Sequence, residues 1–492
     1  MITFLQLDVW KKGCSFMRVS SNTLLILSLF TVLNADTVDA DLAGFDDTPV
    51  IEVEKETTED VMDGFDDAVD STDDTSSASD EMMSGFEDEV PGAVEEEKTD
   101  LIPGLTGKIT EQIAFSWNND EPHDNFTSVK SSLLLDYDHK FENGVRVKVN
   151  AKAYYDAIYS MKGREKFTSQ ELDELESEVE LFDAYVEGKI TDNFDYKVGR
   201  QVVVWGRSDT IRVTDILNPL DNRRPGMTDI EDLRLPVTMA KFDYFIGDWR
   251  ITPIAVLEQR FSKNPPYGGD FNPVHVPAPS NEEYHDVTYA LSIGAEYSGW
   301  DINFYAAQTR DDAGYIDLTD TDKRVQHDKV KMVGTALNIL SGSWLFKTEV
   351  AYFDGLKYTT TGDDEFSRTD ALVGVEYNGI ADTLMSYDIV SRQIHDYDGR
   401  LLAEFNPLDK HHYQHAFRVS SDFLNATLTA NYLISLYGEK LDEGGFQRAW
   451  LKYELADGIN ANVGVVDYIG GSVLFDAFKD NDMVFADISY NF

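Results

Sequence analysis

Residues 205–236 hold the charged side chains that are best placed to act on a solute. The segment contains five Arg and six Asp or Glu, interleaved with Ile, Leu and Pro. Balanced charge of this kind predicts ion pairs within the segment, which would order it and fix the direction of its charged groups. The candidate residues are Arg207, Asp209, Arg212, Asp215, Asn218, Asp221, Arg223, Arg224, Asp229, Glu231, Asp232 and Arg234.

Catalysis and metal binding have less support in the sequence. The chain contains no Gly-x-Ser-x-Gly turn or other nucleophile arrangement, although a Ser and a His on separate strands would leave no such pattern. His411, His412 and His415 lie close together, but on a strand His412 points away from the other two. The three rings therefore do not converge on a metal ion. We expect no enzyme activity, no metal site and no cofactor.

Strands must position the charged segment, because the chain alternates apolar and polar residues from Leu105 onward. No stretch beyond the N-terminal region is apolar for the length that a membrane-spanning helix needs. The pattern predicts strands at 105–117, 127–141, 145–159, 179–188, 193–204, 237–246, 249–259, 285–297, 300–309, 328–340, 343–353, 368–377, 382–394, 411–421, 424–436, 446–455, 459–467 and 483–492.

These 18 segments are joined alternately by short and long connections, and their even number is typical of a single-chain bacterial barrel. The predicted fold is all-β: a transmembrane antiparallel up-and-down β-barrel over residues 105–492 in the outer membrane of a Gram-negative bacterium. Short turns would face the periplasm and long loops the exterior. Trp249, Trp300 and Trp344 each follow a short turn, where an aromatic girdle meets the membrane interface.

The last predicted strand ends the chain on an aromatic residue. Its apolar face consists of Val484, Ala486, Ile488, Tyr490 and Phe492. We expect Phe492 to be the signal that the barrel assembly machinery recognises. The machinery would bind the last strand by pairing the strand's free edge with one of its own β-sheets. Outer-membrane lipid and this machinery are the first expected partners.

Charged residues on the polar faces would line the barrel lumen. Lys130, Lys140, Arg146, Lys148 and Lys152 form a basic stripe on early strands, whereas later strands mix both signs. A basic stripe that faces acids across a pore sets up a transverse field, which favours polar or ionic solutes. The alternative is the ordinary charge of a water-filled lumen.

The N-terminal region divides into two segments. Lys11, Lys12 and Arg18 precede an apolar run, so residues 1–40 predict a signal peptide that is cleaved after Ala35 or Ala40. Residues 41–104 are strongly acidic and poor in large apolar residues, which predicts a disordered periplasmic tail. The acidity of this tail, in a chain whose net charge is −48, argues against binding nucleic acid or bare anionic membrane.

Three repeats interrupt the acidic tail. Gly44-Phe45-Asp46-Asp47, Gly64-Phe65-Asp66-Asp67 and Gly85-Phe86-Glu87-Asp88 are copies of one motif. An isolated aromatic residue amid acids predicts a multivalent docking motif for a periplasmic protein, centred on Phe45, Phe65 and Phe86. The alternative is a solvated spacer whose repeats arose by duplication.

Several motifs resemble a known family. The matching residues are Gly199-Arg200-Gln201, Trp205-Gly206-Arg207-Ser208-Asp209, Asn218-Pro219-Leu220-Asp221, Asp229-Ile230-Glu231-Asp232-Leu233-Arg234-Leu235-Pro236, Asp467-Tyr468-Ile469-Gly470-Gly471 and Asn481-Asp482. They are similar to the outer-membrane family called domain of unknown function 1302 (DUF1302), over roughly residues 105–492. The resemblance implies a barrel, often encoded beside an RND-type exporter, and no established substrate.

Two hypotheses about function follow. The first is a porin-like channel for small polar or amphipathic solutes, narrowed by the segment 205–236. The alternative is an outer-membrane component of an envelope export or lipid-trafficking assembly linked to an RND-type transporter, with the acidic tail docked on a periplasmic partner.

Overall fold

The computed structural model describes residues 103–227, 233–274, 276–277, 279–319 and 323–492. The chain divides into two units, Met1–Thr99 and Asp100–Phe492, and all of these described residues belong to the second. The predicted signal peptide, acidic tail and docking residues Phe45, Phe65 and Phe86 lie outside the described residues.

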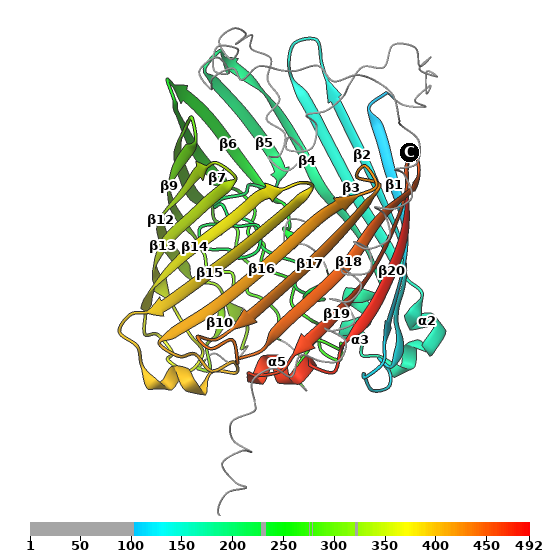
Figure 1. The fold of residues 1–492 in the computed structure, drawn as a ribbon. Helices are drawn as coiled ribbons and strands as arrows, with labels where there is room; N and C mark the ends of the chain where they lie inside the picture. Colours follow the sequence, from blue (N-terminus) through cyan, green and yellow to red (C-terminus); the bar gives the residue numbers. More distant parts are fainter. Residues whose placement is uncertain (1–102, 228–232, 275, 278, 320–322) are drawn as a thin grey trace, which may run out of the picture. The chain divides into compact units, whose positions relative to one another are not determined.

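Within the described residues, an 18-stranded antiparallel sheet closes on itself as a barrel, as predicted (Figure 1). Its strands are β1 (Leu105–Ser116), β2 (Asn125–Lys140), β3 (Arg146–Asp156), β4 (Ser177–Thr191), β5 (Phe194–Gln201), β6 (Val237–Ile246), β7 (Trp249–Val256), β8 (Thr288–Tyr297), β9 (Trp300–Arg310), β12 (Lys329–Ser341), β13 (Trp344–Leu356), β14 (Phe366–Ile380), β15 (Thr383–Ile394), β16 (His411–Phe423), β17 (Leu428–Tyr437), β18 (Gly445–Ala456), β19 (Ile459–Ile469) and β20 (Met483–Asn491).

The connections differ between the two ends of the barrel. Short turns lie at one end, here called the short-turn rim, and longer segments at the other, the long-loop rim (Figure 1). The long-loop rim carries the remaining elements, which are α2 (Ile158–Lys162), η1 (Arg164–Lys166), α3 (Ser169–Leu175), the hairpin β10 (Tyr315–Ile316) and β11 (Val325–Gln326), η2 (Gly399–Ala403) and α5 (Val473–Phe478). No helix in the described part of the chain is long and apolar enough to cross a membrane.

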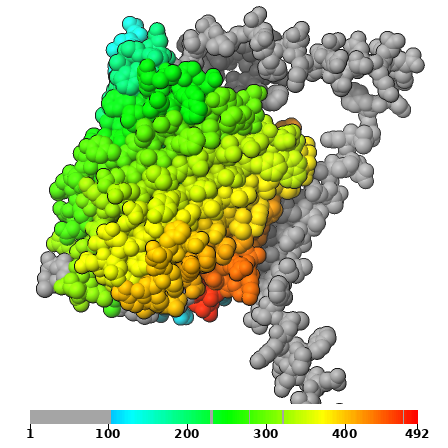
Figure 2. Space-filling view, turned by 90° about the vertical axis from the view of Figure 1, so that its left-hand side faces the viewer, coloured from blue at the N-terminus to red at the C-terminus, as the bar shows by residue number. Residues whose placement is uncertain are grey.

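The barrel wall has an apolar outer face and a polar inner face. On β13, Phe346 and Tyr352 are 48% and 41% exposed, whereas Lys347 and Glu349 on the opposite face are buried. Figure 2 shows the outer face of this side as a closed surface. Trp300 and Trp344 begin their strands at the short-turn rim, where the Trp300 ring stacks on Tyr297 and the Trp344 ring lies tilted against Tyr377. An apolar face on a closed barrel is what a lipid bilayer requires, which places the protein in an outer membrane.

The first and last strands close the barrel, as the sequence predicted. The backbone N–H of Gly107 donates to the carbonyl of Phe492 at 2.8 Å, and the N–H of Phe492 donates back at 2.9 Å. The Phe492 side chain is half exposed on the outer face. Recognition of Phe492 by the assembly machinery stays a prediction.

Several predicted strands are longer than the observed ones, and two of them show the cause. The prediction of a strand over 145–159 is wrong at its end, because the Asp156 carboxylate accepts hydrogen bonds from the backbone of Val129 and Ile158 and turns the chain into α2. The prediction for 193–204 is wrong beyond Gln201. There the Asn218 side chain bonds the backbone of Gln201 and Val203, which takes this segment away from the neighbouring strand.

Gly199 allows a backbone conformation that other residues adopt only at a cost. Its φ is +135°, and a Cβ atom would lie 2.2 Å from the carbonyl oxygen of Ala184. Gly199→Ala should therefore lower barrel stability by about 1–3 kcal/mol or more. Urea unfolding followed by gel mobility measures this change. Gly399→Ala is the control, because nothing lies within 4 Å of its position; equal stability of the two variants would contradict the prediction.

Candidate functional site

The connection from β5 to β6 folds against the inside of the barrel, and its tip comprises residues 206–214. The base of the tip is closed, because the N–H of Trp205 donates to the Asp215 carboxylate at 3.4 Å. The indole of Trp205 stacks on Tyr305 of β9, with ring centroids 4.7 Å apart. Ile211 and Val213 are buried in the same apolar cluster. Burial of each such side chain contributes about 1.5–3 kcal/mol, so the tip is a packed element and not a free loop.

Glu349 of β13 holds the tip through its carboxylate. One oxygen accepts from the N–H groups of Arg207 and Ser208, at 2.5 and 3.0 Å. The other accepts from the N–H and hydroxyl of Thr214, at 3.2 and 2.9 Å. Glu349 is only 1% exposed. Four hydrogen bonds to a buried carboxylate stabilise its charge without a cation, since each bond to a charged group contributes about 1.5–3 kcal/mol.

Neighbouring strands provide further contacts with the tip. Asp388 of β15 accepts hydrogen bonds from the hydroxyls of Ser208 and Thr210, at 2.6 and 2.8 Å. Lys347 of β13 pairs with Asp209 of the tip at 3.2 Å. The tip therefore contacts β9, β13 and β15 about halfway along these strands.

Ion pairs within the connection connect the tip to the rest of the loop. The carboxylate of Asp215 forms ion pairs with the guanidinium groups of Arg234, at 2.8 Å, and Arg212, at 3.2 Å. Both Asp215 and Arg234 are buried. The Asn218 amide donates to the backbone of Gln201 and Leu235, which join the two ends of the connection to adjacent strands. The sequence predicted such internal pairs, and the described part of the segment forms them.

The second half of the connection reaches the opposite side of the barrel. Arg223 donates to Asp221 and to Glu178 of β4, at 2.6 and 2.7 Å. Arg224 lies 3.7 Å from Asp156 of β3. Beyond them, the hydroxyl of Tyr468 of β19 donates to the carbonyl of Pro225 at 2.5 Å. The connection thus crosses the lumen from the β13–β15 wall to β3, β4 and β19.

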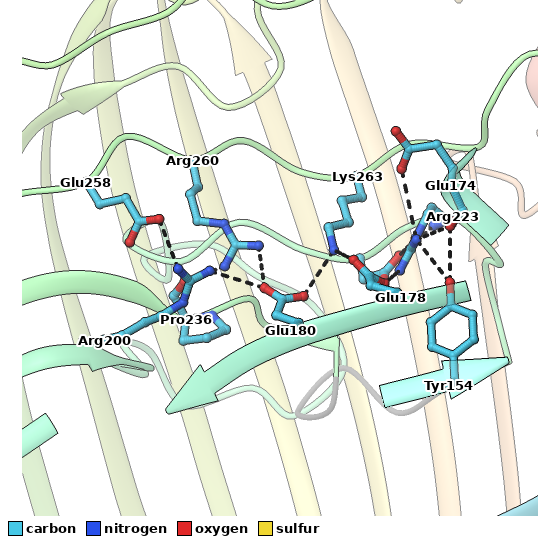
Figure 3. A network of polar contacts seen from close by, with 11 residues as sticks. Tyr154, Glu174, Glu178, Glu180, Arg200, Arg223, Pro236, Glu258, Arg260 and Lys263 are labelled. Atoms are coloured by element: carbon cyan, nitrogen blue, oxygen red, sulfur yellow. Dashed lines mark hydrogen bonds and ion pairs between the residues drawn. The ribbon is translucent and has the colours of Figure 1, made fainter. Parts of the chain in front are cut away.

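A second inward segment, the β7–β8 connection at 257–287, meets this loop on β4 (Figure 3). Glu180 accepts from Arg200 at 3.2 Å, from Arg260 at 2.5 Å and from Lys263 at 3.1 Å. Lys263 also contacts Glu178, which is the partner of Arg223. Removing a carboxylate from such a network leaves unpaired buried charge, which costs about 3–5 kcal/mol.

The five residues of the predicted basic stripe lie on β2 and β3, and they differ in their partners. Arg146 pairs with Asp138 at 2.6 Å, and Lys148 pairs with Asp136 at 3.4 Å. Lys152 lies over the ring of Phe182, and Lys130 lies over that of Tyr154. Lys140 is exposed. Of the predicted loop residues, Asp229, Glu231 and Asp232 lie outside the described residues.

Sequence reasoning missed several site residues. Lys347 and Glu349 lie on the inner face of an alternating strand, so their period-two position was a usable signal. Arg260 and Lys263 belong to an irregular connection, whose inward path has no local sequence signal. Among the described residues, no three His, Cys, Asp or Glu side chains are grouped to hold a metal ion. His415 instead bonds the Tyr387 hydroxyl at 2.8 Å.

The family model "Protein of unknown function (DUF1302)" matches residues 87–492, which is most of the chain. The chain belongs to the DUF1302 family. Its loop motifs Trp205–Asp209 and Asn218–Asp221 are the segments that form the inward connection. No match is found among curated proteins.

Solved structures similar to this DUF1302 protein are outer-membrane proteins. OpdK of Pseudomonas aeruginosa with vanillate is 9% identical, with a TM-score of 0.46 over 79% of this chain and 98% of that chain. OccAB3 of Acinetobacter baumannii is 13% identical, with the same TM-score and coverage. OccK8 (OprE) of Pseudomonas aeruginosa is 11% identical, with a TM-score of 0.45 over 79% and 97%. The barrel architecture of the DUF1302 protein is established by its own strand pairing.

At the long-loop rim, His123 and Glu171 join three connections of the DUF1302 protein. The His123 ring lies 2.7 Å from the carboxylate of the buried Glu171, and Thr168 at the start of α3 donates to the Tyr267 carbonyl. Burial lowers the pKa of His123, but its hydrogen bond to Glu171 and the charge of Asp270 outweigh burial and raise the pKa above 6.5. Burial likewise raises the pKa of Glu171, against the opposing effect of His123.

Both raised pKa values mean that the folded rim binds protons more tightly than the unfolded chain does. For His123, the stabilisation is fully present below the ordinary pKa of histidine and is lost as the pH rises through the folded value. The contribution of Glu171 is lost at lower pH, above the ordinary pKa of glutamate. Hydrogen exchange of residues 158–175 should be slower at about pH 6 than at about pH 8, after correction for the intrinsic rate. His123→Gln should abolish this difference, whereas His411→Gln, at an exposed position, should keep it. An unchanged pH response in His123→Gln would contradict the role of this pair.

Glu349→Gln tests the anchor of the loop tip. In glutamine one carboxylate oxygen is replaced by an NH₂ group, which cannot accept a hydrogen bond. At least one of the tip's donors therefore loses its acceptor. Exchange of the amides of Arg207, Ser208 and Thr214 should accelerate about ten-fold or more. Glu365→Gln changes an exposed residue of another connection and should leave these rates unchanged. Equal protection in both variants would show that Glu349 does not hold the tip.

Proposed function

We propose that this DUF1302 protein is a porin-like channel for small polar or amphipathic solutes, narrowed by the connection 205–236. The observation that carries the proposal is the tip at 206–214, which is held against the inner wall at half-depth by the buried carboxylates of Glu349 and Asp388. A segment that only covered the mouth would need no anchors at that depth.

Barrel size supports the same function. An 18-stranded barrel has a water-filled lumen when only the side chains of its strands line the inside and no loop folds inward. Inward segments then determine how much of that width remains, and their charged groups decide which solutes pass. The paired charges along the connection provide a polar lining, while the buried Ile211 and Val213 keep it packed on the wall.

Conductance in planar bilayers tests the channel and the narrowing together. The base of the tip is closed between Trp205 and Asp215, so residues 207–213 can be excised with Gly206 joined to Thr214. The purified full-length protein should conduct, and the excised variant should conduct more because the lumen is wider at half-depth. Gel mobility confirms that the variant is folded. Unchanged conductance in a folded variant would exclude narrowing by the tip.

The same measurement separates the channel from the export or lipid-trafficking assembly. A folded wild-type barrel without current, together with a periplasmic partner whose capture depends on Phe45, Phe65 and Phe86, would overturn the channel and favour the assembly. These phenylalanines lie outside the described residues, so docking stays a prediction from their repeated spacing.

A further inference from the structure

We propose that the barrel wall has a lateral port at the step between β4 and β5, where β4 continues past the end of β5 over residues 177–183. Amphipathic solutes with a zwitterionic head and one alkyl chain exchange there between the lumen and the membrane leaflet on the long-loop side. This inference rests on the proposed channel function, and it specifies the class of solute and its route.

The barrel wall is low where β5 to β8 form it. β4 has 15 residues, whereas β5 and β7 have 8 each and β6 and β8 have 10 each. A strand of that shorter length rises about 26 Å, which is about 20 Å along the membrane normal at a tilt of about 40°. The apolar band of an outer-membrane barrel is about 25 Å tall. β5 and β7 therefore end inside the hydrocarbon region.

The step leaves one edge of β4 without a partner strand. β3 pairs with β4 as far as Ser177, whereas β5 pairs with it only as far as Ala184. Among the described residues, no strand pairs with residues 177–183 on the side away from β3. At membrane depth such backbone is tolerated only where protein buries it or where it lines a water-filled cavity. Hydrocarbon alone therefore does not suit this part of the wall.

Charged side chains cross the wall at the step (Figure 3). Val198 of β5 is exposed on the outer face, and Arg200 follows it on the same face, because the register with β6 has no shift there. On β4, Val179 is exposed on the outer face, which leaves Glu180 on the inner face. Arg200 nevertheless pairs with Glu180 at 3.2 Å. This ion pair thus joins the two faces of the wall through the gap beyond the end of β5.

Compensation of Glu180 does not require Arg200. Arg260 and Lys263 of the inward connection bind the same carboxylate, at 2.5 and 3.1 Å. Arg200 has a second partner in Glu258, which follows β7, at 3.2 Å. Ionisable residues inside the hydrocarbon region are costly, and they mark solute pathways more often than they stabilise a fold. The position of Arg200 therefore indicates a polar path through the wall.

A cavity of about 510 Å³ adjoins these charges, and its volume is typical of a site for a small molecule. Its lining includes Arg260 and Lys263, which bind Glu180, and also Leu257 and Phe261. The Leu257 N–H donates to the carbonyl of Thr238, the neighbour of Arg200 on β6, and its side chain is exposed. The cavity thus extends from the inner charges to the outer row of the wall, and it offers both charged and apolar contacts.

The step suits a solute with two unlike parts. Val179 is 85% exposed and Leu257 is also exposed, so an alkyl chain has an apolar surface at the outer end of the step. The head group meets three cations and three carboxylates, which are Arg200, Arg260, Lys263, Glu178, Glu180 and Glu258. A zwitterionic head replaces both members of an ion pair at once, so no charge is left without a partner. The head therefore crosses the wall without entering hydrocarbon.

Interruption of the KCl current by an amphiphile tests the port. Dodecylphosphocholine, added below its micelle-forming concentration on the long-loop side, enters that leaflet of a planar bilayer. It should interrupt the current of the full-length protein, whereas phosphocholine at the same concentration should interrupt it much less, because it does not accumulate in the membrane. The variant Val179→Trp with Leu257→Trp fills the outer end of the step. Its interruptions should be several-fold rarer.

Val333→Trp with Val373→Trp is the matched control. Both valines are exposed on the outer face, on β12 and β14, where each strand is paired on both sides. The control adds the same two indoles to the lipid-facing surface away from the step. Its current should be interrupted as often as that of the wild type.

Each result has a distinct meaning. A wild-type current that dodecylphosphocholine does not interrupt, or equal interruption of the port and control variants, overturns the port and leaves the channel standing. No current from any folded protein overturns the channel and the port together. If the double port variant does not fold, Leu257→Trp alone replaces it, and its interruptions should still be rarer than those of Val373→Trp.

Discussion

A strand edge cannot be left unpaired in a lipid bilayer, because hydrocarbon provides no partner for backbone N–H and C=O groups. The rest of this structure depends on that constraint. It forces β1 to pair with β20, and the hydrogen bonds between Gly107 and Phe492 complete the pairing at the chain end. Once 18 strands have closed, their number sets a lumen that their own side chains do not fill.

The connections at 205–236 and 257–287 fold into this lumen. Hydrogen bonds and ion pairs to charged side chains of the barrel wall hold them there. Glu349 and Glu180 show two solutions to the burial of a carboxylate. Glu349 is surrounded by N–H and hydroxyl donors from one loop, whereas Glu180 gathers three cations from a strand and an inward connection. Both solutions compensate the charge inside the barrel, where an uncompensated one would be costly. The loops are therefore rigid parts of the lumen wall.

Ion pairs compensate several basic residues inside the barrel. Arg146 pairs with Asp138, Lys148 with Asp136 and Lys263 with Glu178. A transverse field was expected from the early basic stripe, of which Arg146 and Lys148 pair with acids on β2. Whether a basic residue forms an ion pair depends on which side chains lie beside it on the neighbouring strands. That neighbourhood is fixed by the strand register, which is set when the sheet closes.

The sequence by itself determined the barrel, because a period of two between residues reports which side of each strand meets lipid. It also located the charged segment 205–236 and the closing strand that ends at Phe492. It overestimated β3 and β5, since the carboxylate of Asp156 and the amide of Asn218 end these strands through contacts that are distant along the chain. Only the tertiary structure decided where that segment lies and which charges it compensates. The physical reason is that Glu349, Asp388 and Glu180 meet their partners only when the barrel has closed around the inward loops.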